Sequence, residues 1–595
     1  MLRTLMPRTS RAPFVACSCF IALAAAMTPG CASPTKASKN PTSTAIEAHS
    51  AEPNSTASSS ASTTTATPTA ATPTRAVRPV ETFDAVWTTV RDSHFDKTLN
   101  GVDWIAVREE LRPQAINAAS QDELRAVLLD MLSRLGQSHF TILPGDVAEA
   151  SPTIETTREQ VRAPETEVAS AAASAPAAST NSTTSRSTTS RSTTSSDSNT
   201  SDANVNASVS AEESAETAAP ELHGPGYSGL DIALVEGETT VLRVAPDSPA
   251  AAAGVLPGWT IIAVDGTRLA DALRGLREAL ARESDTNSPH TRQLRTELAV
   301  AGASFAEGSA GATRTLTFAT ADGERDVALT LSAPPLGAQE FGNLPPLPIS
   351  VGSRVVEIAA PAKPIRIGVI DFNIWLAGAS ASIDRAVDSL RSCDGIVIDL
   401  RGNPGGLGAM SMGVAGHFLS EPASLGLMIG RDTTLEFKAT PRKVSTAGKR
   451  VRPYSKPLAI LVDARSASTS EVFAGGLQDL GRARVFGETS AGMALPAQAI
   501  ELPNGDVLMH AVADFVTSKG TRMEGRGVIP DEVAVPTRAE LLAGNDAALL
   551  AATNWISGHA LAAREAKNAT SPAPAAVEAA SVPTLAPAAA PDDHE

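Results

Sequence analysis

The sequence is poor in cysteine, in aromatic residues and in net positive charge. It has 4 cysteines in 595 residues, and Cys17, Cys19 and Cys31 fall in or beside the first apolar run. Cys393 is then alone in the expected folded part, which excludes a disulfide framework and a cysteine metal site. The formal charge of −16, with no basic stripe, argues against a nucleic-acid partner. No pattern indicates a metal or an organic cofactor.

The chain also lacks an apolar run long enough for a comfortable membrane span. Its run from Phe14 to Met27 follows three arginines and is typical of a secretory signal. Cys31 follows directly, at the edge of a Ser, Thr, Ala and Pro tract, so we expect a lipidated cysteine on a flexible tether. Signal cleavage near Ala24 or Ala26 is the alternative, because Pro29 is unusual before a lipoprotein cleavage point. Both interpretations predict an exported, periplasmic protein, and the first attaches it to the outer membrane.

Low-complexity tracts mark the boundaries of the folded parts. Residues 32–79, 150–220 and 567–595 lack the periodicity and the large apolar residues of a core. We therefore predict that they are a disordered tether, linker and tail. After the signal, residues 1–31, the remaining segments predict a helical domain at 80–149, a β-rich unit at 221–340, an α/β unit at 341–540 and a C-terminal helix at 541–566.

The first unit has apolar residues at helical spacing. Phe83, Val86, Trp87 and Val90 form one such set, and a second set runs from Leu124 to Leu135. The second helix should end near Gly136, which places Ser138 and His139 just past its end. A histidine at that place is either a functional group or an ordinary helix-terminal residue that balances the dipole.

The second unit resembles a PDZ domain. A glycine-rich segment, Tyr227 to Ile232, precedes a strand, a Pro-Ala helix, a turn at Gly258 and a strand from Ile261 to Val264. The resemblance implies that a free peptide carboxylate binds the loop formed by Ser228, Gly229, Leu230, Asp231 and Ile232. A generic small β domain without a ligand is the alternative. The stretch from Arg282 to Ala312 has the composition of a polar insertion outside the core.

The third unit alternates short apolar strands with helical patterns, which predicts an α/β core. Asp399 to Gly406 follows one strand and carries three glycines, which can bring backbone N–H groups close to a ligand. Ser466 to Glu471 lies between the strand Leu458 to Val462 and a helix, where a serine beside helix N–H groups suits nucleophilic catalysis. Taken singly, these segments are also consistent with a plain turn and a plain helix cap.

The order of these motifs resembles the carboxy-terminal processing (tail-specific) protease family, serine peptidases with a PDZ domain. Gly487-Glu488-Thr489 and the segment from Gly525 to Asp531 complete the pattern. The resemblance implies a multidomain α/β (α+β) protein with a ClpP/crotonase-like protease core. It also implies that Ser468 is the nucleophile and that the oxyanion donors are the N–H of Thr469 and that of Gly405 or Gly406.

One position departs from that family. Met493 stands where the tail-specific branch has its lysine base, and a thioether cannot serve as that base. The tricorn-like and retinoid-binding-protein-like branch has a Ser-His pair and a late glutamate instead, which match Ser138, His139 and Glu524 here. The resemblance thus implies His139 as the base, oriented by Ser138 and Glu524.

Three other basic residues are alternatives to His139. His510 is the second choice, because it ends a predicted strand and could approach the site. His417 lies in an apolar stretch and fits a core position better, and Lys519 has turn surroundings that indicate solvation.

The sequence therefore predicts an exported serine endopeptidase. Its PDZ domain would capture protein or peptide substrates by their free C-terminal ends, and Ser468 would form an acyl-enzyme. A catalytically silent protein that holds peptides or apolar ligands on the same fold is the alternative, which Met493 keeps open. Substrate identity, oligomeric state and the role of the linker do not follow from the sequence.

Overall fold

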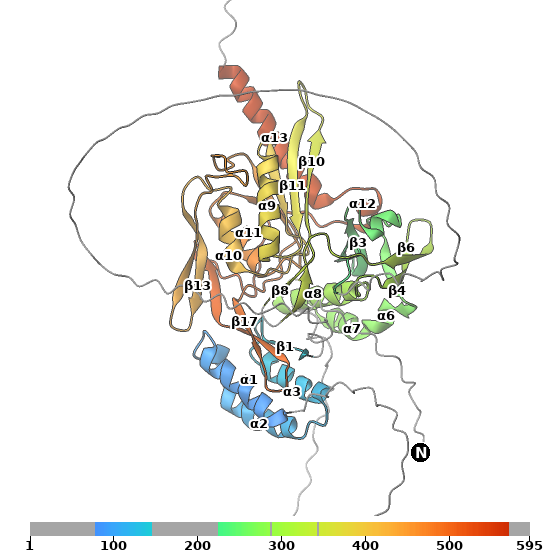
Figure 1. Ribbon diagram of the computed structural model, residues 1–595, viewed down its shortest axis with the longest axis vertical. Helices are drawn as coiled ribbons and strands as arrows, with labels where there is room; N and C mark the ends of the chain where they lie inside the picture. Colours follow the sequence, from blue (N-terminus) through green and yellow to red (C-terminus); the bar gives the residue numbers. More distant parts are fainter. Residues whose placement is uncertain (1–77, 146–223, 286–287, 342–343, 571–595) are drawn as a thin grey trace, which may run out of the picture. The chain divides into compact units, whose positions relative to one another are not determined.

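The computed structural model describes residues 78–145, 224–285, 288–341 and 344–570 (Figure 1). The predicted signal with Cys31, all of the linker, and nearly all of the tether and of the tail lie outside these residues. Within the described ranges, no helix combines the length and the apolar character that crossing a membrane requires.

Three helices form the amino-terminal part: α1 (Pro79–Ser93), α2 (Trp104–Ile116) and α3 (Gln121–Ser133). A short 3-10 turn, η3 (Leu99–Gly101), joins the first two. Each indole of Trp87 and Trp104 donates to the backbone carbonyl of the other residue, at 2.8 and 3.1 Å, which fixes α1 against α2. Ser120 caps α3 by accepting from the N–H of Glu123.

This helical part is joined to the core through a shared sheet. β1 (Thr141–Leu143) follows α3 and pairs antiparallel with β18 (Val507–Ala511), which in turn pairs with β17 (Ala497–Glu501). Leu502 and Leu508 belong to the same hydrophobic cluster as the side chains of α1 to α3. The segment after α3 is therefore held by strands more than 350 positions later.

The second unit is a twisted antiparallel sheet in the order β2-β3-β4-β6-β7, with β5 paired to β4. Its strands are β2 (Leu230–Val235), β3 (Glu238–Val244), β4 (Thr260–Val264), β5 (Thr267–Arg268), β6 (Thr313–Ala319) and β7 (Glu324–Thr330). Its helices are α5 (Pro249–Ala252), α6 (Leu269–Ala272), α7 (Arg274–Arg282) and α8 (Pro289–Ser304). β2 is an edge strand of this sheet, and α8 packs beside it.

The prediction of a polar insertion outside the core at 282–312 is wrong, because this stretch contains the helix α8. Leu294 and Leu298 are buried in the same cluster as Trp259 and Phe318. Leu294 and Leu298, four positions apart, form an apolar stripe among the charged residues of α8, such as Arg295 and Glu297. Average composition hides such a stripe, which explains the wrong prediction.

The largest sheet follows the order β10-β11-β12-β15-β16-β20, parallel from β11 onward and with β10 as an antiparallel edge. Its strands are β10 (Val351–Ile358), β11 (Ile365–Phe372), β12 (Gly395–Asp399), β15 (Leu458–Val462), β16 (Arg484–Gly487) and β20 (Glu532–Val533). Every residue of β12 and β15 is buried, as the continuous apolar runs require. The prediction of an α/β core is confirmed.

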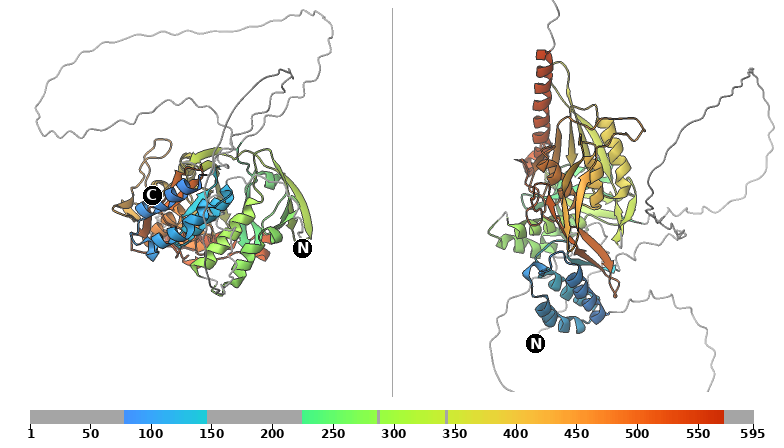
Figure 2. Two further views of the ribbon diagram at one scale, coloured as in Figure 1. Left: turned by 90° about the horizontal axis from the view of Figure 1, so that it is seen from below. Right: turned by 90° about the vertical axis from the view of Figure 1, so that its left-hand side faces the viewer.

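Helices cover both faces of this sheet. Ile396 and Ile398 of β12 pack on one face with α9 (Ala377–Leu390), α10 (Gly408–Ala415) and α11 (Thr469–Asp479). Val397 of β12 points to the opposite face, toward α13 (Ala547–Thr570). The right-hand view of Figure 2 shows α13 and the α9 layer on opposite sides of the strands.

Smaller elements complete the described part: the sheet β14-β13-β19, the hairpin β8–β9 and the short helix α12 (Arg538–Leu542). Their strands are β8 (Ala338–Phe341), β9 (Leu344–Pro348), β13 (Ala423–Gly430), β14 (Thr434–Ala439) and β19 (Ala513–Thr517). The loops after β12, β15 and β16 leave the same edge of the parallel sheet, where sites form in open α/β sheets.

The packing of α8 can be tested by truncation. Leu298→Ala should lower the free energy of unfolding by about 2–5 kcal/mol, because the Leu298 side chain is 1% exposed and its removal leaves a cavity. Urea unfolding followed by tryptophan fluorescence, to which Trp259 of the same cluster contributes, is the measurement. Leu256→Ala is the control, since Leu256 is 56% exposed. Equal midpoints for both variants would contradict the packing of α8.

Candidate active site

Ser468 lies at the junction of the β15 loop and α11 and has a strained backbone. Its φ of 53° and ψ of −117° fall outside the regions that a serine ordinarily adopts, which costs about 1–3 kcal/mol and is typical of functional positions. Its backbone N–H donates to the carbonyl of Met493 at 2.9 Å and to the carboxylate of Glu471 at 3.1 Å. These contacts hold the serine in the strained turn, with its side chain partly exposed.

The glycine loop after β12 approaches Ser468 closely. A Cβ atom on Gly405 would lie 2.7 Å from the Cβ of Ser468 and 3.0 Å from the nitrogen of Thr469, and Gly405 has a φ of 105°. No other residue fits there. The hydroxyl of Thr469 donates to the carbonyl of Gly406 at 2.8 Å and so ties the two loops together.

Two backbone N–H groups beside Ser468 are candidate oxyanion donors. Gly405 N–H donates to the side-chain oxygen of Asn403 at 3.0 Å and is thereby engaged. The N–H groups of Gly406 and Thr469, in contrast, have no acceptor among the described residues. Of the two glycines named from the sequence, the geometry favours Gly406.

Ser138, His139 and Glu524 form a hydrogen-bonded chain. Glu524 accepts from the N–H of Ser138 at 2.8 Å and from its hydroxyl at 2.9 Å. The Ser138 hydroxyl lies 2.8 Å from Nδ1 of His139. Because the hydroxyl donates its proton to the carboxylate, it accepts from Nδ1–H, which leaves Nε2 of His139 unprotonated. Burial lowers the pKa of His139 to about 4 and raises the pKa of Glu524.

Met493 and Ala494, here called the strap, connect the hydrogen-bonded residues Ser138, His139 and Glu524 to Ser468. The backbone N–H of Ala494 donates to Glu524 at 3.0 Å, and the preceding residue, Met493, accepts from the N–H of Ser468. Within the described residues, the His139 ring and the Ser468 hydroxyl do not hydrogen-bond directly. Catalytic hydrogen bonds are often long without substrate and tighten in the complex.

Glu471 is a site residue that the sequence did not reveal as one. Its side chain is fully buried and accepts from the Ser490 hydroxyl at 2.5 Å and from the N–H groups of Gly492 and Met493 at 2.8 and 3.0 Å. Burial raises its pKa to about 7, although these donors act in the opposite direction. The Ser-x-x-Glu spacing of a capping box was the available signal. Glu471 thus fixes the strap and Ser468 together.

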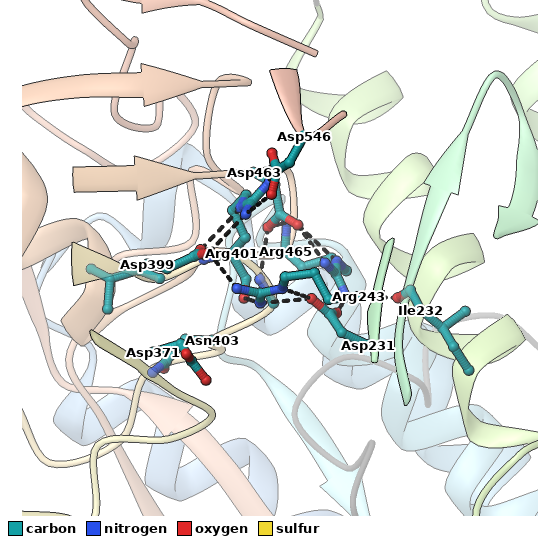
Figure 3. A network of polar contacts seen from close by, with 12 residues as sticks. Asp231, Ile232, Arg243, Asp371, Asp399, Arg401, Asn403, Asp463, Arg465 and Asp546 are labelled. Carbon is teal, nitrogen blue, oxygen red and sulfur yellow. Dashed lines mark hydrogen bonds and ion pairs between the residues drawn. The ribbon is translucent and has the colours of Figure 1, made fainter. Parts of the chain in front are cut away.

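A cluster of buried ion pairs supports both loops (Figure 3). Asp399, at the end of β12, pairs with Arg243 of β3 and with Arg401 at 2.7 Å. Arg401 also pairs with Asp546, which precedes α13, at 2.7 Å. Burial acts against ionisation, but the two guanidinium groups lower the pKa of Asp399. The glycine loop is therefore anchored to the second unit and to α13.

The loop that carries Ser468 joins the same cluster of ion pairs through Arg465. This guanidinium pairs with Asp231 of β2 at 2.7 Å and donates to the carbonyl of Ile232 at 2.6 Å. Although burial opposes it, the neighbouring Arg465 and Arg243 lower the pKa of Asp231. Two of the five residues named for carboxylate binding thus contact the loop that carries Ser468.

The other three residues of that loop are held within the second unit. The Ser228 hydroxyl accepts from the N–H of Leu230 at 3.2 Å. Gly229 packs so closely on Ser248 that a Cβ atom would lie 2.1 Å from the Ser248 side chain. A side chain larger than hydrogen is therefore excluded at Gly229.

The competing bases lie in other surroundings. Nδ1 of His510 is 3.2 Å from the hydroxyl of Ser93, and burial lowers the pKa of His510. His417 is fully buried and contacts Asp384 and Arg391, and Lys519 is exposed. Among the described residues, no group of three or more His, Cys, Asp or Glu side chains is placed to hold a metal ion.

Two family descriptions match parts of the chain. Residues 366–534 match the description "Peptidase family S41", and residues 79–133 match "Tricorn protease C1 domain". The carboxyl-terminal-processing protease of Picosynechococcus is 31% identical over 170 residues, which are 28% of this chain and 39% of that protein. Its counterpart in Synechocystis is 26% identical over 347 residues, which are 58% of this chain and 70% of that protein.

Among solved structures, a photosystem II D1 C-terminal processing protease is 19% identical. The match covers 79% of this chain and 98% of that one, with a TM-score of 0.42. These matches identify a peptidase family S41 domain at residues 366–534, preceded by a tricorn C1 domain at residues 79–133.

Proposed function

We propose that this chain hydrolyses peptide bonds of protein substrates through an acyl-enzyme on Ser468, with His139 as the base. The observation that carries the proposal is the chain from Glu524 through Ser138 to His139, tied by Ala494 to the loop that binds Ser468. It supplies an oriented, unprotonated imidazole nitrogen and a strained serine in one connected site.

The first step forms the tetrahedral intermediate. Oγ of Ser468 attacks the carbonyl carbon of the scissile bond while its proton passes to Nε2 of His139. The carbonyl oxygen becomes an oxyanion that accepts from the N–H groups of Gly406 and Thr469. Glu524, through the Ser138 hydroxyl, supports the positive charge that develops on the imidazole.

The second half returns the proton. His139 gives its proton to the leaving amine as the carbon–nitrogen bond breaks, which leaves an ester on Ser468. A water molecule then attacks the ester, passes a proton to His139 and releases the carboxylic acid, and His139 restores the proton to Ser468. Met493 takes part through its backbone alone, so the missing lysine is not required.

Substrate capture belongs to the second unit in this proposal. We propose that a free carboxyl end binds the loop from Ser228 to Ile232 and that the adjoining peptide pairs with the edge strand β2, as in PDZ domains. The contacts of Arg465 with Asp231 and Ile232 support a connection between that loop and Ser468. Export to the periplasm, with or without a lipid on Cys31, is part of the same proposal.

A catalytically silent binding protein is the second candidate. Met493 in place of the lysine favours it, and so does the lack of a direct His139–Ser468 hydrogen bond in the described part of the chain. Such a protein would hold a peptide at the loop from Ser228 to Ile232 and at β2 without forming a bond to Ser468.

Labelling with a serine-directed fluorophosphonate separates the two candidates. The purified wild type should be labelled and should cleave an unstructured protein. Ser468→Ala should lose both activities, and His139→Ala should retain between about 1% and 0.01% of the rate, because a general base contributes about 10²–10⁴-fold. Ser518→Ala, at an exposed serine outside the site, is the control. A wild type that is neither labelled nor active would favour the silent protein.

The pH dependence of kcat/KM tests the state of His139. An unperturbed histidine has a pKa of about 6.5, whereas burial lowers that of His139 to about 4. The base is neutral above its pKa, so cleavage should persist as the pH falls below 6 and should be lost as the pH approaches 4. His510→Ala should leave this acid limb unchanged. Because Glu471 has a pKa of about 7 and binds the backbone of Ser468, an acid limb near pH 6.5 that persists in Glu471→Gln would contradict a base of lowered pKa.

A further inference from the structure

His139 has a backbone conformation that its surroundings must enforce. Its φ of 62° is in the left-handed region, which a histidine adopts at a cost of about 1–3 kcal/mol. Ser138 is held by Glu524, but this contact lies on one side of the His139 peptide unit only. The residues on the outer sides of the Ser138–His139 pair, Gln137 and Phe140, therefore decide how the imidazole is presented.

Both of these residues contact one side chain, that of His94. The ring of His94 is fully buried, and its Nε2 lies 2.9 Å from the side-chain oxygen of Gln137. The N–H of Asp96 donates to Nδ1 of His94 at 3.0 Å. An amide oxygen only accepts, so Nε2 of His94 carries the proton that is donated to Gln137, whereas Nδ1 lies beside both the N–H and the carbonyl of Asp96, at 3.0 and 2.9 Å.

The same ring stacks on Phe140. The two ring centroids are 5.4 Å apart with an interplanar angle of 10°, and Phe95 stacks on His94 at 4.7 Å and 19°. Gln137 contacts the edge of the imidazole, at Nε2, and Phe140 contacts its ring face. His94 thus holds the chain immediately before Ser138 and immediately after His139.

His94 is itself rigidly placed. It caps the C-terminus of α1, where its backbone N–H donates to the carbonyl of Val90 at 3.0 Å. Its carbonyl accepts from the guanidinium of Arg431 at 2.9 Å, between β13 and β14. The carboxylate of Asp96 closes the next turn through the N–H and hydroxyl of Thr98. A ring fixed in this way can impose a conformation on its neighbours.

We propose that His94 is a positioning residue, which holds Gln137 and Phe140 so that the strained His139 presents its imidazole to Ser468. The inference rests on the proposed function and deepens it. It gives the amino-terminal helices a part in catalysis: they deliver the base and also fix its orientation. His94 touches neither the substrate nor the reacting atoms.

Three variants test the proposal. His94→Ala removes the hydrogen bonds and the stacking, and kcat should fall about 10- to 100-fold with KM within about twofold, because misplacement of a catalytic group costs rate more than binding. His94→Phe keeps the buried volume and the stacking and should recover part of kcat. His417→Ala removes another fully buried, polar-bonded histidine, distant in the fold, and should leave kcat per fluorophosphonate-titrated site within about twofold.

A second readout does not depend on hydrolysis. The ring of His139, followed by NMR in histidine-labelled protein, should titrate near pH 4 in the wild type and closer to 6.5 in His94→Ala. It should be unchanged in His417→Ala. An unchanged kcat and an unchanged His139 titration in His94→Ala would overturn the inference, and so would an equal loss of kcat in His417→Ala. A wild type without Ser468-dependent hydrolysis would instead refute the proposed function, and the titration would still decide the role of His94.

Discussion

The candidate site depends on one carboxylate, that of Glu524. It accepts from the N–H and the hydroxyl of Ser138 and from the N–H of Ala494, so it joins the segment after the amino-terminal helices to the strap beside Ser468. Burial raises the pKa of Glu524, and these three donors favour its charged form. Without this junction, the proposed base and the proposed nucleophile would belong to separate parts of the structure.

Close packing and strain support that junction. Ser468 and His139 both have a positive φ, and each is held by hydrogen bonds from the residues around it. A side chain at Gly405 would collide with Ser468. The carboxylate of Glu471 accepts from the N–H groups of both Ser468 and Met493 and so holds the strap beside Ser468. Arg465 extends the connection to β2. The strained backbone lowers the stability of the fold but fixes the geometry around the Ser468 hydroxyl, as is common at functional sites.

Much of this arrangement can be predicted from the sequence. Buried runs such as Leu458–Val462 indicate parallel strands, and the resemblance to the protease family and its tricorn-like branch points to Ser468, Ser138, His139 and Glu524. The structure places Ser138 and Glu524, 386 positions apart, in direct contact. Glu471 and His94 could not be assigned, because their roles come from burial and from partners distant in the chain. Helix α8 was missed because its buried residues Leu294 and Leu298 alternate with charged residues in the sequence.

The most direct test is a crystal structure of the protein after reaction with a fluorophosphonate, whose phosphorus mimics the tetrahedral carbon. The account predicts a covalent bond to Oγ of Ser468. The phosphonyl oxygen should lie within hydrogen-bond distance of the N–H groups of Gly406 and Thr469, and Nε2 of His139 should face the adduct. An adduct whose oxygen points away from both N–H groups, or a His139 ring turned from Ser468 with another base in its place, would contradict it.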